Sequence, residues 1–173
     1  MTDTELMRQA LELAREAAAD GEVPVGCVIA RKGEIVGRGR NRREKGKSAL
    51  AHAEIEAISE ACETLGGWRL WECDLFVTLE PCPMCAGAIV NARIPRVVYG
   101  ASDDKCGAVR SVCALFDMRF NHHPTVEAGL LEEEASALLQ QFFEPRADCL
   151  IELHPITTVP VAVLALYGDC LLN

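Results

Sequence analysis

Two short motifs place three metal-binding side chains and one carboxylate under a single geometric constraint. The first motif is His52-Ala53-Glu54, and the second is Pro81-Cys82-Pro83-Met84-Cys85. Zinc binds nitrogen and sulfur ligands tetrahedrally, and catalytic zinc sites use three protein ligands and a water molecule. Because His52, Cys82 and Cys85 supply such a set, the fold must bring two distant segments to one point.

The remaining carboxylate, Glu54, lies two residues after the histidine, and we predict that it moves protons rather than binding metal. Zinc lowers the pKa of its bound water to about 7, which provides zinc-bound hydroxide at neutral pH. A nearby carboxylate can accept the proton and return it to a ring nitrogen. The pattern therefore predicts hydrolytic deamination, in which hydroxide attacks the ring carbon that bears the amino group.

Two other interpretations of the cysteine pair compete with this one. A structural zinc site has four protein ligands, and neither Cys73 nor Cys106 has the spacing of a fourth. A zinc-stabilised RNA-binding module without turnover is the non-enzymatic alternative. A redox-active C-x-x-C pair is disfavoured by the upstream His-x-Glu and by the proline on the turn.

Length and composition predict one globular domain with a substantial core. The chain has 173 residues, of which 50% are hydrophobic and 25% charged. Its first residues lack the basic and apolar regions of a secretory signal, and its longest apolar run, 159–166, is far shorter than the ~20 residues of a spanning helix. Nine cysteines, an odd number, favour a reducing compartment. We therefore expect a cytoplasmic protein with no membrane partner.

The charge distribution qualifies the acidic net charge of −9. Residues 31–47 contain eight lysines and arginines against two glutamates, so this stretch is locally basic and the rest strongly acidic. A polyanion would be attracted to one face and repelled elsewhere. A solvated hairpin with a basic loop is the alternative. Its place directly before His52 favours a rim that faces substrate.

Hydrophobic periodicity predicts strands and helices in alternation after an initial hairpin, which implies an α/β protein with a mixed five-stranded sheet between helices. The segment 41–47 is expected to be a basic loop, and 102–109 a polar loop that contains glycine. The expected helices are 4–19, 51–65, 83–92 and 131–143, and the expected strands are 25–30, 34–39, 74–79, 96–101 and 125–128. This pattern puts both metal motifs at helix N-termini, where the helix dipole favours thiolates.

Further elements, in the same order, resemble the bacterial tRNA-specific adenosine deaminases, the TadA type of the cytidine and deoxycytidylate deaminase superfamily. The H-x-E…P-C-x-x-C signature alone is typical of zinc-dependent nucleobase deaminases in general. The resemblance runs from about residue 4 to Phe143. The elements that carry it are Val23-Pro24-Val25-Gly26, Gly39-Arg40-Asn41-Arg42, Ala51–Glu54, Thr78–Ile89 and Gly100–Ala108.

This resemblance implies a cytidine-deaminase-like three-layer α/β/α sandwich, one zinc ion per chain and a homodimer. The implied reaction converts adenosine to inosine at the wobble position of a tRNA anticodon stem-loop. By the same resemblance, Asn41 would bind the target base, Asp103 a ribose and Lys105 a phosphate. Phe142 and Phe143 would lie near the RNA, where an aromatic ring can stack on a base.

Each of these assignments has an alternative. Asn41 is also a common residue type at the end of a strand, Asp103 and Lys105 also suit a solvated loop, and core packing suits at least one of the two phenylalanines. A guanine or cytidine deaminase acting on a free base or nucleoside is the alternative enzyme.

The chain departs from the family after its paired phenylalanines. Glu144-Pro145 stands where basic residues are usual, and only Arg146 remains. The residues that follow are apolar and unlike the family. We therefore predict a deaminase domain at 1–146 and an atypical C-terminal tail at 147–173.

Overall fold

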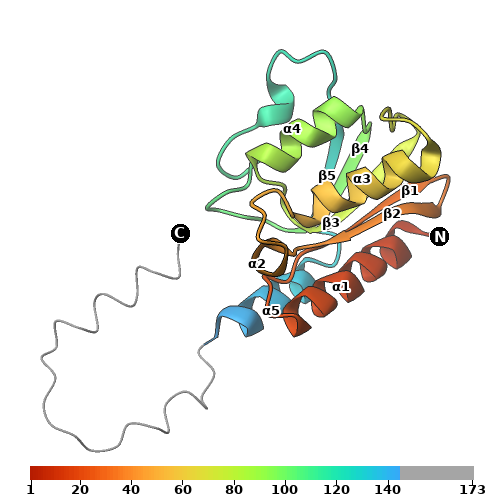
Figure 1. Cartoon of the computed structure of the whole chain (residues 1–173). Helices are drawn as coiled ribbons and strands as arrows, with labels where there is room; N and C mark the ends of the chain where they lie inside the picture. The colour runs from red at the N-terminus through yellow and green to blue at the C-terminus, as the bar shows by residue number, and fades with distance from the viewer. Residues whose placement is uncertain (145–173) are drawn as a thin grey trace, which may run out of the picture. The chain divides into compact units, whose positions relative to one another are not determined.

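The computed structural model describes residues 1–144, and a five-stranded sheet forms the centre of this part of the chain (Figure 1). The strands are β1 (Gly26–Arg31), β2 (Glu34–Arg40), β3 (Cys73–Leu79), β4 (Arg96–Ala101) and β5 (Thr125–Ala128). Their order is β2-β1-β3-β4-β5; β1 is antiparallel to β2 and β3, and β3, β4 and β5 are parallel. The predicted mixed sheet is confirmed, whereas the predicted tail at 147–173 lies outside the described residues.

Helices cover both faces of the sheet, as the predicted three-layer sandwich requires. Figure 1 shows α3 and α4 on one face and α1 and α5 on the other. The helices are α1 (Asp3–Ala19), α2 (Arg43–Gly46), α3 (Ala53–Leu65), α4 (Pro83–Ala92) and α5 (Glu132–Phe143), with a 3-10 turn at Leu115–Asp117. No helix of residues 1–144 is both long and apolar enough to cross a membrane.

Two glycines on β2 explain how closely α3 packs on the sheet. A Cβ atom at Gly37 or Gly39 would overlap the backbone of α3, at Ala57 and Ala53 respectively. Because glycine has no Cβ, the helix backbone can rest directly on the strand. This contact fixes the N-terminal end of α3, and with it His52, at one edge of the sheet.

The segment 41–47 departs from the predicted loop, because residues 43–46 form the short helix α2. The buried Glu22 carboxylate accepts hydrogen bonds from the backbone N–H groups of Glu44 (3.2 Å) and Lys45 (2.8 Å). These bonds satisfy amides that a helix start leaves without partners. A four-residue helix held by a residue 22 to 23 positions upstream has no periodic signal of its own.

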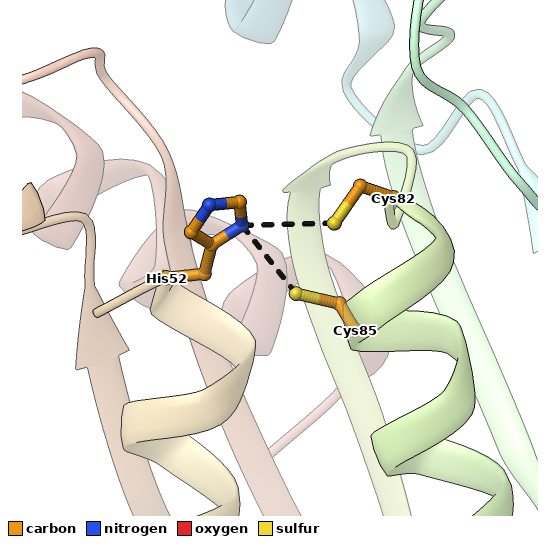
Figure 2. A group of neighbouring side chains, drawn as sticks. All are labelled: His52, Cys82 and Cys85. Atoms are coloured by element: carbon orange, nitrogen blue, oxygen red, sulfur yellow. Dashed lines mark hydrogen bonds between the residues drawn. The ribbon is translucent and has the colours of Figure 1, made fainter. Parts of the chain in front are cut away.

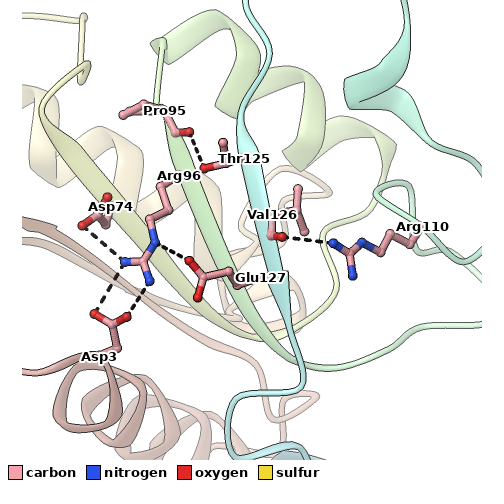
Figure 3. Close-up of polar contacts among 8 residues, drawn as sticks. All are labelled: Asp3, Asp74, Pro95, Arg96, Arg110, Thr125, Val126 and Glu127. Atoms are coloured by element: carbon pink, nitrogen blue, oxygen red, sulfur yellow. Dashed lines mark hydrogen bonds and ion pairs between the residues drawn. The ribbon is translucent and has the colours of Figure 1, made fainter.

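An arginine joins four elements at the end of the sheet where β4 begins (Figure 3). The Arg96 guanidinium pairs with Asp3 (2.5 Å), Asp74 (3.5 Å) and Glu127 (2.8 Å), which lie on α1, β3 and β5. The metal motifs follow the opposite ends of the strands. This cluster therefore stabilises the sandwich at a distance from the site.

Candidate active site and metal centre

Two helix N-termini carry the predicted metal ligands. His52 is the N-cap residue of α3 and Cys82 is the N-cap residue of α4, with Pro83 in the first turn. Neither N-cap side chain makes a capping hydrogen bond. Both side chains are therefore available to a ligand, and Cys85 joins them from the first turn of α4.

The three side chains point toward one another with the spacing of a metal site (Figure 2). Nδ1 of His52 lies 3.7 Å from Sγ of Cys82 and 3.5 Å from Sγ of Cys85. All three ligand atoms lie within 4.8 Å of one another. A tetrahedral zinc ion with ordinary Zn–N and Zn–S bonds holds nitrogen and sulfur about 3.6 Å apart. The residues therefore fit one zinc ion, and they leave a coordination position for water.

The thiols are already polarised toward metal binding. Hydrogen bonds from Cys85 and His52 lower the pKa of Cys82 to about 4, against the opposing effect of burial. The hydrogen bond to Cys82 raises the pKa of Cys85, as does its own burial. A coordinated divalent cation deprotonates such thiols outright.

Glu54 occupies the second position of α3 and is only 3% exposed. Burial raises its pKa to about 7. A buried carboxyl group with a pKa near neutrality, beside the metal ligands, suits both accepting and donating a proton.

His52, Glu54 and Cys82 line one cavity of about 210 Å³, whereas Cys85 is fully buried. Sites for drug-sized ligands are typically ~300–1,000 Å³, so this cavity suits a single ring system. Its lining is formed by Val23, Val25, Asn41, Arg43, His52, Ala53, Glu54, Leu79, Glu80, Cys82, Asp103 and Cys106.

The predicted substrate residues separate into two groups. Asn41 is buried in the cavity wall, with its backbone N–H donating to Val25 (3.0 Å), and Asp103 also lines the cavity. Lys105 is exposed on the same loop as Asp103 but outside the lining.

The two phenylalanines lie elsewhere than the cavity wall. Phe142 and Phe143 end α5, in edge-to-face contact at 5.2 Å between ring centroids. Phe143 is 58% exposed and Phe142 is partly buried. Within the described residues, neither phenylalanine belongs to a core cluster, and Phe142 is the more buried of the two.

Sequence analysis assigned no site role to four polar residues that line or support the cavity. Arg43, Cys106 and the almost fully buried Glu80 line the cavity, and the buried Glu22 holds the backbone of the 41–47 segment. The basic stretch was the only signal for Arg43. Buried glutamates have no sequence signal, because their partners are backbone amides from distant segments.

The basic stretch 31–47 is partly neutralised by acidic neighbours. Lys45 pairs with Asp20 (2.5 Å) and Arg42 with Glu56 (3.9 Å), and further pairs join Arg40 to Asp20 and Arg31 to Glu72. Within residues 1–144, Lys32, Arg38, Arg43 and Lys47 have no ion pair. Arg43 is the one of these that also lines the cavity.

Residues 1–101 match the family described as the cytidine and deoxycytidylate deaminase zinc-binding region. The chain belongs to this deaminase family. The match includes all three candidate metal ligands and Glu54, and it supports one zinc ion per chain.

Relatives of this deaminase have a narrower description. Over 141 residues this chain is 49% identical to the tRNA-specific adenosine deaminase of Streptococcus pyogenes serotype M1, and the match covers 81% of this chain and 82% of the relative. The enzyme of the same description from Bacillus subtilis is 48% identical over 145 residues, covering 83% of this chain and 90% of that one.

Two solved structures distinguish branches of the family. One comes from studies of A-to-I editing by tRNA:A34 deaminases at the wobble position, with a TM-score of 0.76 and 47% identity over 79% of this chain and 99% of that chain. The other is a guanine deaminase from Nitrosomonas europaea, with a TM-score of 0.66 and 27% identity over 82% and 84%. Both confirm the cytidine-deaminase-like fold predicted from the sequence.

Proposed function

We propose that this protein converts adenosine to inosine at the wobble position of a tRNA anticodon by zinc-dependent hydrolysis. One observation carries the reaction class: His52, Cys82 and Cys85 form a metal-binding group, and His52, Cys82 and the buried Glu54 line one cavity of about 210 Å³. The substrate rests on the relatives, since 47–49% identity to tRNA adenosine deaminases exceeds 27% to a guanine deaminase.

The residues divide the chemistry among them. His52, Cys82 and Cys85 would hold the zinc ion, which would acidify a water molecule at neutral pH. Glu54 takes the proton from the attacking water and delivers it to a ring nitrogen of adenine, then assists departure of the amino group as ammonia. The overall balance is adenosine plus water to inosine plus ammonia.

The cavity wall orients the base for this attack. Asn41 is buried in the wall and presents a side-chain amide, which can donate to one base atom and accept from another. Asp103 also lines the cavity, and its carboxylate accepts a hydrogen bond from a ribose hydroxyl. Lys105, exposed on the same loop, contacts a neighbouring phosphate, and Arg43 adds positive charge on the opposite rim.

The wider recognition surface follows from the same substrate. An anticodon stem-loop presents splayed bases and phosphates, and an exposed aromatic ring such as Phe143 offers a stacking surface. We also propose that the enzyme works as a homodimer in the cytoplasm and that its deaminase domain ends at residue 146.

The test is inosine sequencing of tRNA incubated with the zinc-loaded protein. We expect inosine at position 34 of a tRNA that carries adenosine there, and no ammonia release above background from free guanine or cytidine. The Glu54→Ala variant controls for a contaminating deaminase. Ammonia from guanine without inosine in tRNA would replace this proposal with the free-base alternative.

A further inference from the structure

Glu80 is a buried carboxylate that the proposed reaction does not use. It lies two residues before Cys82 and is only 2% exposed. Its Oε1 accepts hydrogen bonds from the backbone N–H groups of Val109 (3.1 Å), Arg110 (2.7 Å) and Ser111 (3.0 Å). Its Oε2 accepts from the Asp103 backbone N–H (3.1 Å) and the Ser111 hydroxyl. Five donors thus converge on one carboxylate.

All five donors come from the segment 103–111, which forms one rim of the cavity. Within this rim the Asp103 side chain accepts from the backbone N–H groups of Lys105 and Cys106, both at 3.0 Å. The Gly107 N–H donates to the Asp103 carbonyl at 2.8 Å. Asp103 therefore holds the turn that follows it, while Glu80 holds Asp103 itself.

The rim encloses Glu80 so closely that Gly107 has no room for a side chain. A Cβ atom there would overlap the Glu80 carboxyl group and would lie 2.6 Å from the Asp103 carbonyl oxygen. Further hydrogen bonds attach the rim, among them the Ala108 N–H to the Pro81 carbonyl (2.9 Å) and the Arg110 guanidinium to the Val126 carbonyl (3.0 Å; Figure 3).

We infer that Glu80 is a positioning residue, which fixes the 103–111 rim so that Asp103 faces the sugar of the bound nucleotide. Glu80 joins this rim to the segment that carries Cys82, so one anchor sets the distance between the metal centre and the sugar-binding carboxylate. This inference rests on the proposed function for the role of Asp103, but the anchoring is independent of the substrate.

The first measurement needs no substrate. In zinc-loaded Glu80→Gln, the side-chain NH₂ group faces backbone donors in place of an acceptor oxygen. We expect faster amide hydrogen exchange across 103–111, with zinc still at one per chain. The matched control is Glu60→Gln, since Glu60 also accepts a backbone N–H, from Arg38 at 2.9 Å, but lies outside the cavity lining. Unchanged exchange in Glu80→Gln would overturn the anchoring.

The second measurement separates positioning from general damage. For an RNA anticodon hairpin, we expect Glu80→Gln to raise KM about tenfold with less than about a threefold change in kcat, since a tenfold change is a typical loss for one charged hydrogen bond. Glu60→Gln should match the wild type. A fall in kcat with unchanged KM would overturn the inference.

The third measurement is a double-mutant cycle with Asp103→Asn, read as the ratio of kcat/KM for RNA and matching single-stranded DNA. If Glu80 acts through Asp103, the Asp103→Asn change alters this ratio in the wild type but not in Glu80→Gln. Additive effects would overturn the inference. A wild type that deaminates neither substrate would refute the proposed function instead, while the exchange measurement would still decide the anchoring.

If Glu80→Gln does not fold, Ser111→Ala takes its place. This change removes one donor and leaves the carboxylate and the other four bonds. We expect a rise in KM in the same direction of about two- to threefold. Wild-type KM and wild-type exchange in Ser111→Ala would overturn the inference.

Discussion

In each of the two rims of the cavity, a buried glutamate accepts backbone hydrogen bonds, but the two rims differ in the charged side chains around them. Glu22 accepts two backbone N–H bonds from the rim at 41–47, and Glu80 accepts bonds from the rim at 103–111. Around the first rim stand exposed ion pairs, including Lys45 with Asp20 and Arg42 with Glu56. The second rim is held by hydrogen bonds to one buried carboxylate.

This difference suggests a division of labour. Exposed ion pairs are weak and screened by salt, so the 41–47 rim presents adjustable charge to a polyanion. Buried hydrogen bonds to a carboxylate are stronger and less sensitive to salt, so the 103–111 rim keeps a fixed geometry. We expect the first rim to govern attraction and the second to govern orientation.

The largest expected effects remove the metal centre, on which both rims depend. Cys82→Ala takes away one of three ligands, and we expect zinc and activity to be lost together. The measurement is zinc content by elemental analysis beside inosine formation in tRNA. A variant that lost zinc yet kept its rate would end the catalytic metal assignment.

Glu54→Ala tests the chemistry between the rims without removing metal. Positioned proton transfer contributes ~10²–10⁴-fold, and we expect kcat to fall by that amount or more. Zinc content and tRNA affinity should stay near the wild type, because Glu54 is almost fully buried and is not one of the three metal ligands. Glu60→Ala, farther along the same helix, is the control. A near-normal kcat in Glu54→Ala would remove its assignment as proton carrier.

A matched pair of glycine substitutions tests the packing of the two rims. Gly107→Ala puts a Cβ into Glu80, and overpacking of this kind costs ~1–3 kcal/mol. Gly46→Ala meets only the Ala51 Cβ at 3.7 Å, and alanine favours the helical backbone of α2. Urea unfolding should therefore show a loss for the first variant and no loss for the second. Equal midpoints would contradict the tighter enclosure of the 103–111 rim.

The sequence predicted the strands, the longer helices and the metal centre, but not the two buried glutamates that hold the rims. Alternation and helical spacing placed the strands and the longer helices, with small shifts at their ends, and motif spacing indicated the metal centre. The roles of Glu22 and Glu80 were not predicted, because a buried carboxylate depends on backbone amides that only the tertiary fold brings near. The charge of the 31–47 stretch was overestimated for the same reason, since Asp20, Glu56 and Glu72 pair with it from other segments.

The next effect sharpens the role of the basic rim. Arg43 has no ion pair within residues 1–144 and lines the cavity, whereas Arg42 pairs with Glu56 at 3.9 Å. We expect Arg43→Gln to weaken tRNA binding about tenfold at low salt and to reduce the salt slope by ~0.7, the value for one neutralised phosphate of a single strand. Arg42→Gln should have the smaller effect.

The measurement is the dissociation constant for tRNA at several salt concentrations. Equal slopes for both variants and the wild type would mean that neither arginine contacts a phosphate. That result would favour a free-base substrate and would contradict the expectation that the 41–47 rim governs the attraction of a polyanion.

The smallest effect falls on the 103–111 rim and concerns the sugar. Asp103 accepts the hydrogen bonds of its own turn through Oδ1, and within residues 1–144 its Oδ2 has no hydrogen-bond partner. A ribose hydroxyl can donate to this free oxygen, whereas deoxyribose offers no donor and brings a phosphate toward an uncompensated charge. Asp103→Asn keeps the acceptor of the turn, removes the charge and adds a donor. We therefore expect the RNA-to-DNA ratio of kcat/KM to narrow by only about threefold, the scale of a neutral hydrogen bond.

Both substrates should be compared at one salt concentration, with Asp104→Asn as the control for charge on the same loop. A ratio that narrows equally in both variants would assign the effect to general repulsion of a polyanion. An unchanged ratio in Asp103→Asn would mean that Asp103 only stabilises its own turn and does not contact the sugar.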